Sequence, residues 1–203
     1  MKSLPPLSLR AGRMLFSAED VRTLAGANAG VALGDDFTIS IVSNAERQQT
    51  LLSTLGRSVR RGCERCGVEP VLVLGDPRHP GVVAGFLGFS TRFGRSAETG
   101  LPFYDVSVDD LVLNGSLDTT GYAEVLVAGL CRVVVDDFRM MASASGYERL
   151  SVVDFQYCAP AKADLPREAA ALIAERLRTV FHRLVPAVYP NLTPCIGALD
   201  IAA

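Results

Sequence analysis

The stretch VLVLGDPRHPGVVAGFL, residues 71–87, decides the predicted fold. Two apolar runs of strand length, 71–74 and 82–87, flank a turn that contains two glycines and two prolines. Such runs separated by a short Gly- and Pro-rich segment predict a β-hairpin. A hairpin joins antiparallel strands, so the sheet is not expected to be fully parallel.

Further strands and helices are expected on both sides of this hairpin. The segment 37–42 alternates apolar and polar residues as a strand does, and Ser43 with Glu46 forms a capping box that begins a helix. We expect a polar loop over 90–102. The predicted strands are 7–16, 37–42, 71–74, 82–87, 105–113 and 150–157, and the predicted helices begin near 17, 43, 119 and 164. The chain is therefore predicted to be one α+β (mixed α/β) domain, 1–203, with helices packed on a mixed or antiparallel sheet.

The composition is apolar for a soluble domain. Hydrophobic residues make up 49% of the 203 residues, and the mean hydropathy is +0.26. In the predicted helix 119–145 the apolar side chains point in nearly every direction, and a helix that is hydrophobic all round is buried all round. Because one sheet covers only one side of a helix, further helices or a second subunit must cover the other. We expect a second subunit, in a homo-oligomer or hetero-oligomer.

Charge and targeting signals narrow the class of protein. The formal net charge is −2 and the isoelectric point about 5.7, so neither nucleic acid nor an anionic membrane is an expected partner. Prolines interrupt the N-terminal segment 1–7, which does not resemble a signal peptide. The five cysteines are an odd number, and we expect free thiols in the cytoplasm. No motif implies a cofactor.

Cys63 and Cys66 form the one recognisable motif, Cys-x-x-Cys. The pair could bind a metal or act in redox chemistry. A metal site would need two more ligands, and no second Cys pair supplies them. Both cysteines also continue the apolar stripe of their predicted helix, where free cysteine packs as a small hydrophobe. The pair Cys63 and Cys66 therefore has three alternative roles: a metal site, a redox pair or packing in the core.

Two titratable residues are candidate catalytic groups. Asp154 lies in the apolar segment VVDF, and a carboxylate buried there must be paired or hydrogen-bonded. His79 lies in the hairpin turn between Arg78 and Pro80, near Asp76, where an imidazole could act as a general base. Each residue also has a purely structural interpretation, as an ion pair or as part of a surface turn.

These observations lead to two hypotheses for function. The first is an oligomer-forming subunit with a binding or assembly role and no catalytic motif. The alternative is an enzyme that acts on a small anionic substrate, with its pocket at a subunit interface and with Asp154, His79 and arginines taking part. A thiol or metal protein built on Cys63 and Cys66 is a third, weaker possibility.

Overall fold

The predicted hairpin is present. In the computed structural model of the chain, β3 (Val71–Gly75) pairs antiparallel with β4 (Val83–Arg95). The intervening turn is closed by two backbone hydrogen bonds. The Asp76 N–H donates to the Val82 carbonyl at 2.9 Å, and the Val82 N–H donates to the His79 carbonyl at 3.0 Å.

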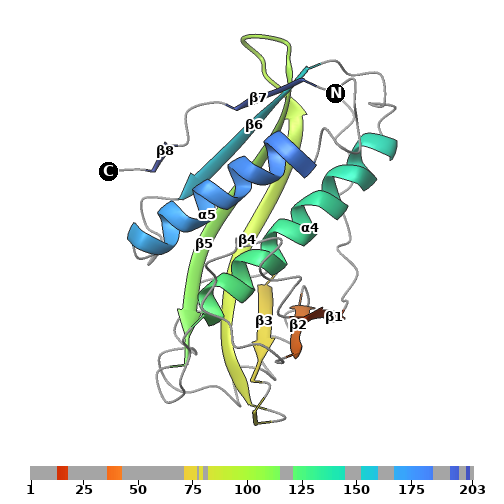
Figure 1. Cartoon of the computed structure of the whole chain (residues 1–203). Coiled ribbons are helices and arrows are strands. Elements are labelled where there is room, and N and C mark those ends of the chain that lie inside the picture. Colours follow the sequence, from red (N-terminus) through yellow and green to blue (C-terminus); the bar gives the residue numbers. More distant parts are fainter. Residues whose placement is uncertain are drawn as a thin grey trace.

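The strands form one eight-stranded mixed sheet in the order β1-β2-β3-β4-β5-β6-β7, with β8 also paired to β6 (Figure 1). Neighbours from β1 to β5 are antiparallel, whereas β6 is parallel to β5, β7 and β8. The predicted α+β class is therefore confirmed. The remaining strands are β1 (Arg13–Ser17), β2 (Asp36–Val42), β5 (Pro102–Leu113), β6 (Val152–Ala159), β7 (Thr193–Ile196) and β8 (Asp200–Ile201).

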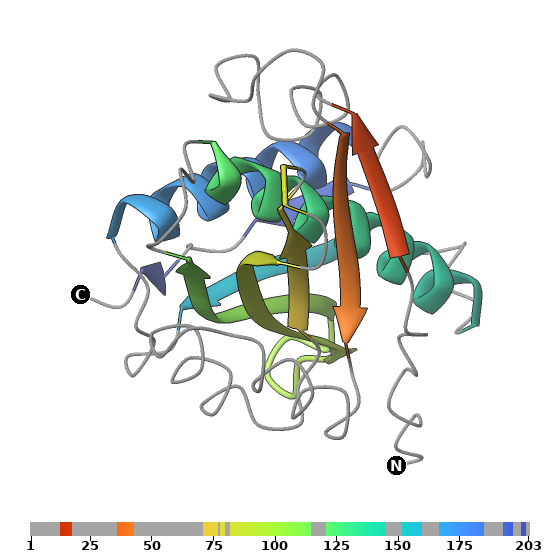
Figure 2. The same ribbon diagram turned by 90° about the horizontal axis from the view of Figure 1, so that it is seen from below.

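Two helices lie on one side of this sheet (Figures 1 and 2). Helix α4 (Tyr122–Ala144) connects β5 to β6, and α5 (Arg167–Thr179) follows β6 and continues into the π-helical turn η2 (Val180–Leu184). Parallel neighbours need a crossover connection of this kind, because a tight turn cannot bring the chain back to the same end of the sheet. The structure describes residues 13–17, 36–42, 71–76, 78–79, 82–114, 121–144, 152–159, 167–184, 193–196 and 200–201.

Helix α4 is buried within the single chain. It packs against the sheet and against α5, and β2 approaches it closely at Gly129. The helix exposes a stripe at four-residue spacing, in which Arg132 Nε donates to Asp136 Oδ2 at 2.9 Å and Met140 is 44% exposed. Its apolar residues at most 3% exposed are Val125, Leu126, Val127, Ala128, Leu130, Cys131, Val133, Val134 and Phe138.

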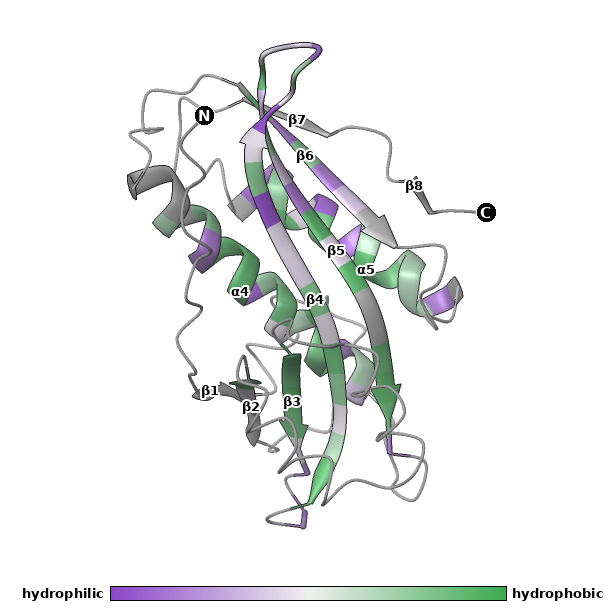
Figure 3. Cartoon of the chain, turned by 180° about the vertical axis from the view of Figure 1, so that it is seen from behind, coloured by the Kyte–Doolittle hydropathy of each residue, from purple (hydrophilic) through white to green (hydrophobic). Residues whose placement is uncertain are grey.

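Strand β4 extends further than the sequence predicted. The expected polar loop 90–102 is wrong, because residues 90–95 continue β4 and only 96–101 form a loop. The reason is that none of the described helices covers the opposite face of the sheet, called the helix-free face of the described residues below, so polar side chains on that face can point to solvent from a regular strand. Thr91 and Phe93 point to the helix side, while Arg92 is exposed between them. Figure 3 shows that hydrophilic residues occur along β4, β5 and β6.

Neither described helix combines the length and the apolar character that crossing a membrane would require.

Candidate functional site

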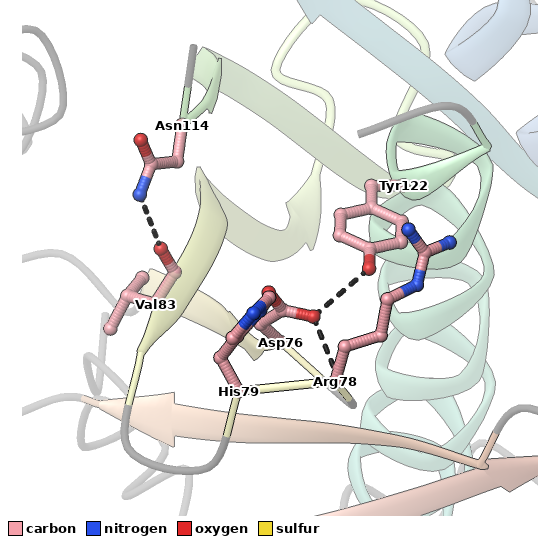
Figure 4. Close-up of polar contacts among 6 residues, drawn as sticks. All are labelled: Asp76, Arg78, His79, Val83, Asn114 and Tyr122. Carbon is pink, nitrogen blue, oxygen red and sulfur yellow. Dashed lines mark hydrogen bonds and ion pairs between the residues drawn. The ribbon is translucent and has the colours of Figure 1, made fainter. Parts of the chain in front are cut away.

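A buried carboxylate organises the turn between β3 and β4. The Asp76 side chain is 2% exposed and uses both oxygens (Figure 4). Its Oδ1 accepts hydrogen bonds from the Arg78 N–H at 3.0 Å and from the Tyr122 hydroxyl at 3.1 Å. Its Oδ2 lies 2.7 Å from Nδ1 of His79. The turn thus places the Asp76 carboxylate, with both oxygens hydrogen-bonded, beside the imidazole of His79.

The protonation of this pair follows from its contacts. Burial raises the pKa of Asp76, but hydrogen bonds from His79, the Arg78 amide and Tyr122 outweigh burial, so the pKa is lowered overall. An ionised carboxylate only accepts hydrogen bonds, so Nδ1 of His79 must be the donor. In the neutral imidazole the lone pair is then on Nε2. Because the His79 side chain is 62% exposed, Nε2 is accessible to a ligand.

Tyr122 is the part of this cluster that the sequence did not reveal. It is the first residue of α4, follows Gly121 at a φ of 81°, and is 2% exposed. In the sequence it stands among the apolar residues of the predicted helix 119–145. The available signal was chemical: a buried tyrosine usually finds a partner for its hydroxyl, and Asp76 is an acidic residue directly after the apolar strand 71–75.

The adjacent end of β5 has an unpaired backbone edge. Pairing with β6 stops at Ser107 and Cys158, and β6 itself ends at Ala159, whereas β5 continues to Leu113. The Asn114 N–H donates to the Ala84 carbonyl of β4 at 2.8 Å. Backbone groups alternate in direction along an antiparallel strand, so the N–H and C=O of Leu113 point away from β4. Within the described ranges, no strand pairs with this edge.

A β-bulge lies directly before this edge. Gly88 of β4 pairs with Asp110 and Phe89 pairs with Val108, so Asp109 is an extra residue on β5. Bulges bend a strand, increase its twist and frequently lie beside functional sites. Here the bend begins where β5 passes the end of β6 (Figure 1).

The unpaired edge and the Asp76 cluster lie at the same end of the sheet. The Asn114 side-chain amide donates to the Val83 carbonyl at 3.1 Å, which places the end of β5 beside the hairpin turn (Figure 4). The first turn of α4 joins the same region through Tyr122. The carboxyl ends of parallel strands together with the start of the connecting helix form the usual ligand position in sheets of this type.

The structure does not bring Asp154 and His79 together. Asp154 pairs with Phe103 on β5, whereas the His79 turn adjoins the other end of that strand. Ten strand residues separate the two positions, which corresponds to roughly 30 Å. Asp154 is half-buried on the helix-free face, where the Gln156 amide donates to its Oδ2 at 2.7 Å. The expected hydrogen-bonded partner is present, but a shared cleft is not.

The predicted metal ligands Cys63 and Cys66 lie outside the described residues. Among the residues that the structure describes, no group of three His, Cys, Asp or Glu side chains is arranged to hold a metal ion. Cys131 is a free, buried cysteine of α4, and burial raises the pKa of its thiol to about 12. That thiol is therefore neither a nucleophile nor a ready metal ligand.

No protein-family model and no curated protein sequence matches the chain. Two solved structures are similar to it at a low level. One is a tyrosine-to-phenylalanine variant of the toxin AtaT bound to the C-terminus of the antitoxin AtaR and to acetyl-CoA, with 19% identity, a TM-score of 0.36, and coverage of 70% of this chain and 83% of that one. The other is a tyrosine-to-phenylalanine variant of KacT, with 18% identity, a TM-score of 0.31, and coverage of 82% and 85%.

The first hypothesis for function, an oligomer-forming subunit with a binding or assembly role and no catalytic site, is corrected here. Its main support was α4, whose apolar surface was expected to need a second subunit. That surface is already covered in the single chain, and the helix exposes a stripe that contains an ion pair. The first hypothesis therefore loses its main support, which leaves the alternative, an enzyme that acts on a small anionic substrate.

Proposed function

We propose that this chain is an enzyme that binds a small anionic acyl carrier of the acyl-CoA class and transfers its acyl group. The unpaired backbone edge of β5 at Leu113 carries the proposal. The acyl arm of such a carrier is an extended chain with amide groups. An extended ligand with amides can add to an exposed strand edge by backbone hydrogen bonds.

The anionic part of the substrate has suitable groups nearby. Arg78 is exposed on the hairpin turn, and α4 begins beside it (Figure 4). Arginine is suited to phosphate because its guanidinium presents several N–H donors in one plane. The amides at the start of a helix add further donors. The carboxylate of Asp76 is already fully engaged and faces inward, so it does not repel an anion at the surface as a free carboxylate would.

His79 is proposed as the general base. Nε2 accepts the proton of the acceptor's nucleophile as the nucleophile bonds to the acyl carbon. The bond between that carbon and the thiol sulfur of the carrier breaks, and the leaving thiolate takes the proton from the imidazolium. Asp76 stabilises the imidazolium during the step and fixes which nitrogen carries the proton. Asp154 lies at the other end of β5 and has no part in this proposal.

Binding of acetyl-CoA to the full chain by calorimetry is the first test. We expect saturable binding, and we expect the substitution Leu113→Pro to weaken it about fivefold, because one backbone hydrogen bond worth ~1 kcal/mol is lost. Proline removes the N–H that points away from β4 and leaves the Asn114–Ala84 bond in place. Leu113→Ala is the matched control, because it also loses the leucine side chain but keeps the N–H.

Two results would contradict the proposal. One is the absence of binding of acetyl-CoA and of coenzyme A at millimolar concentration. The other is equal weakening by Leu113→Pro and Leu113→Ala, which would show that the amide is not used. Transfer itself is checked by mass spectrometry with a set of primary-amine acceptors. His79→Gln should abolish the transferred mass while binding of acetyl-CoA persists.

A protein partner, an oligomer and a cytoplasmic location remain predictions from the sequence. AtaT was solved with a segment of its antitoxin, and for this chain a protein partner is a proposal that copurification of the full chain would test. A pocket at a subunit interface is not needed for the proposed chemistry, because the described groups that support it come from one chain.

A further inference from the structure

A tyrosine hydroxyl ties the first residue of α4 to the carboxylate that holds His79. The Tyr122 hydroxyl donates to Asp76 Oδ1 at 3.1 Å, and the Arg78 N–H donates to the same oxygen at 3.0 Å. The other oxygen, Oδ2, accepts from Nδ1 of His79 at 2.7 Å. One helix and one turn therefore meet on a single buried side chain (Figure 4).

We propose that Tyr122 is a positioning residue that sets the tautomer and orientation of His79 through Asp76. This inference rests on the proposed function only in giving His79 a role in proton transfer. Each carboxylate oxygen accepts about two hydrogen bonds. Tyr122 and the Arg78 amide together fill Oδ1, so rotation of the carboxylate is resisted and Oδ2 is left for the imidazole.

The exposure of His79 makes this support necessary. Its side chain is 62% exposed, so packing alone does not fix the ring, whereas Asp76 is 2% exposed and Tyr122 is also 2% exposed as a residue. A buried carboxylate that is itself held by further hydrogen-bond donors can orient an exposed imidazole. Such a carboxylate fixes which ring nitrogen of the histidine carries the proton. Loss of the Tyr122 hydroxyl leaves Oδ1 with one donor and frees the carboxylate to turn.

The same contact couples the site to α4. Gly121 has a φ of 81°, a backbone conformation that favours glycine, and it brings the chain into the helix immediately before Tyr122. With α4 beginning at this residue, the hydroxyl of Tyr122 reaches Asp76 in the turn. The start of the helix and the state of the imidazole are linked by one hydrogen bond.

Nitrogen-15 NMR of the histidine rings in the full chain tests the inference without any substrate. The chain has two histidines, and His79→Gln assigns their signals. At a pH where the ring is neutral, we expect His79 in the wild type to be almost entirely the tautomer with the proton on Nδ1. Tyr122→Phe should produce a mixture of both tautomers, and Asp76→Asn should lose the preference further.

Tyr104→Phe is the matched control. It removes a buried tyrosine hydroxyl that also donates to an aspartate, Asp137, but at another position along α4. We expect it to leave the His79 tautomer unchanged. A Tyr122→Phe spectrum identical to the wild type would overturn the inference, as would an equal effect of Tyr104→Phe.

Activity gives a second, separable readout. If the proposed acyl transfer holds, Tyr122→Phe should lower kcat about threefold to tenfold while KM for acetyl-CoA is unchanged, because positioning affects the proton transfer and not binding. If acetyl-CoA is not a substrate, the tautomer measurement still decides the role of Tyr122. Circular dichroism and Tm confirm that each variant is folded.

Discussion

Tyr104 and Asp137 are joined by a 2.6 Å hydrogen bond from the tyrosine hydroxyl of β5 to Oδ2 of the aspartate on α4. Both residues are buried. Burial raises the pKa of Asp137 even though Tyr104 and Thr91 bond to it, and burial together with the charge of Asp137 raises the pKa of Tyr104. A second tyrosine–aspartate pair, Tyr122 with Asp76, lies elsewhere along the helix, and there the pKa of the carboxyl is lowered.

The raised pKa of Asp137 makes its contribution to stability fall as the pH rises. Above its ordinary pKa near 3.8 the unfolded chain releases this proton more readily than the folded chain, so the free energy of unfolding declines with pH until the folded pKa is passed. Asp137→Asn removes this decline and still accepts the Tyr104 bond. Urea titrations of both proteins between pH 3 and 8 should show the variant gaining relative to the wild type as pH rises. A constant difference would contradict the assignment.

Asp76 should behave in the opposite way. Its lowered pKa means that stability is fully present above the ordinary value near 3.8 and is lost as the pH falls through the folded pKa. Asp76→Asn should cost about 1–3 kcal/mol at neutral pH, because charge-assisted hydrogen bonds in a buried site are weakened. The deficit should shrink in acid. The same urea titrations measure it, and a deficit that grows in acid would show that this carboxyl is not ionised in the folded chain.

Gly85 is expected to tolerate no side chain. A Cβ at this position of β4 would lie 2.7 Å from the Val112 carbonyl oxygen and 2.9 Å from a methyl of Leu113. Backbone oxygen in the middle of a sheet cannot move aside without breaking the ladder, so Gly85→Ala should cost about 1–3 kcal/mol. Gly75→Ala is the control, because its Cβ would meet only the Thr38 carbonyl at 3.8 Å. Equal melting temperatures of the two variants would refute the close approach.

Cys131 should resist alkylation in the folded protein. The thiol is buried, and its pKa of about 12 leaves almost no thiolate at pH 8. Treatment with iodoacetamide followed by peptide mass spectrometry should leave Cys131 unmodified in native buffer and modified in urea. Labelling at equal rates in both conditions would show that α4 opens without global unfolding.

A substitution at Met140 tests whether α4 forms an interface between subunits, as the first hypothesis required. It lies in the exposed stripe of α4 with Arg132 and Asp136, and 44% of it is exposed. If this stripe faces solvent in the working protein, Met140→Glu should change neither the native mass by light scattering nor Tm by more than a few degrees. A fall in native mass on substitution would place an interface between subunits on this helix.

Several parts of the fold could be predicted from local patterns. The hairpin at 71–87 follows from two apolar runs around a Gly- and Pro-rich turn, and strand β2 follows from its alternation. The end of β4 could not be predicted, because Ser90 and Arg92 resemble loop residues unless it is known that none of the described helices covers one face of the sheet. Strands β7 and β8 were also missed, since both are short and pair only with β6.

The candidate site divides in the same way. Asp76 and His79 lie three residues apart in a turn, so their proximity could be expected from the sequence, and an imidazole beside a carboxylate was a reasonable general base. Tyr122 lies 46 residues from Asp76, and only the packing of α4 against β3 brings the two together. Asp154 shows the converse. Its apolar sequence environment made it a candidate catalytic residue, but its position in the sheet is remote from His79.

The sequence by itself determined the class of fold and several of its elements, among them the hairpin at 71–87 and strand β2, because hydrophobic periodicity and turn chemistry act over a few neighbouring residues. Only the tertiary structure decided what covers α4, which end of β5 remains unpaired, and which hydroxyl holds Asp76. These three features depend on contacts between segments that are distant in the sequence. A one-residue change of strand register would alter such contacts, because every side chain of that strand would move to the other face of the sheet. An apolar helix sequence predicts that the helix is buried, whereas the path of the whole chain decides which segments bury it.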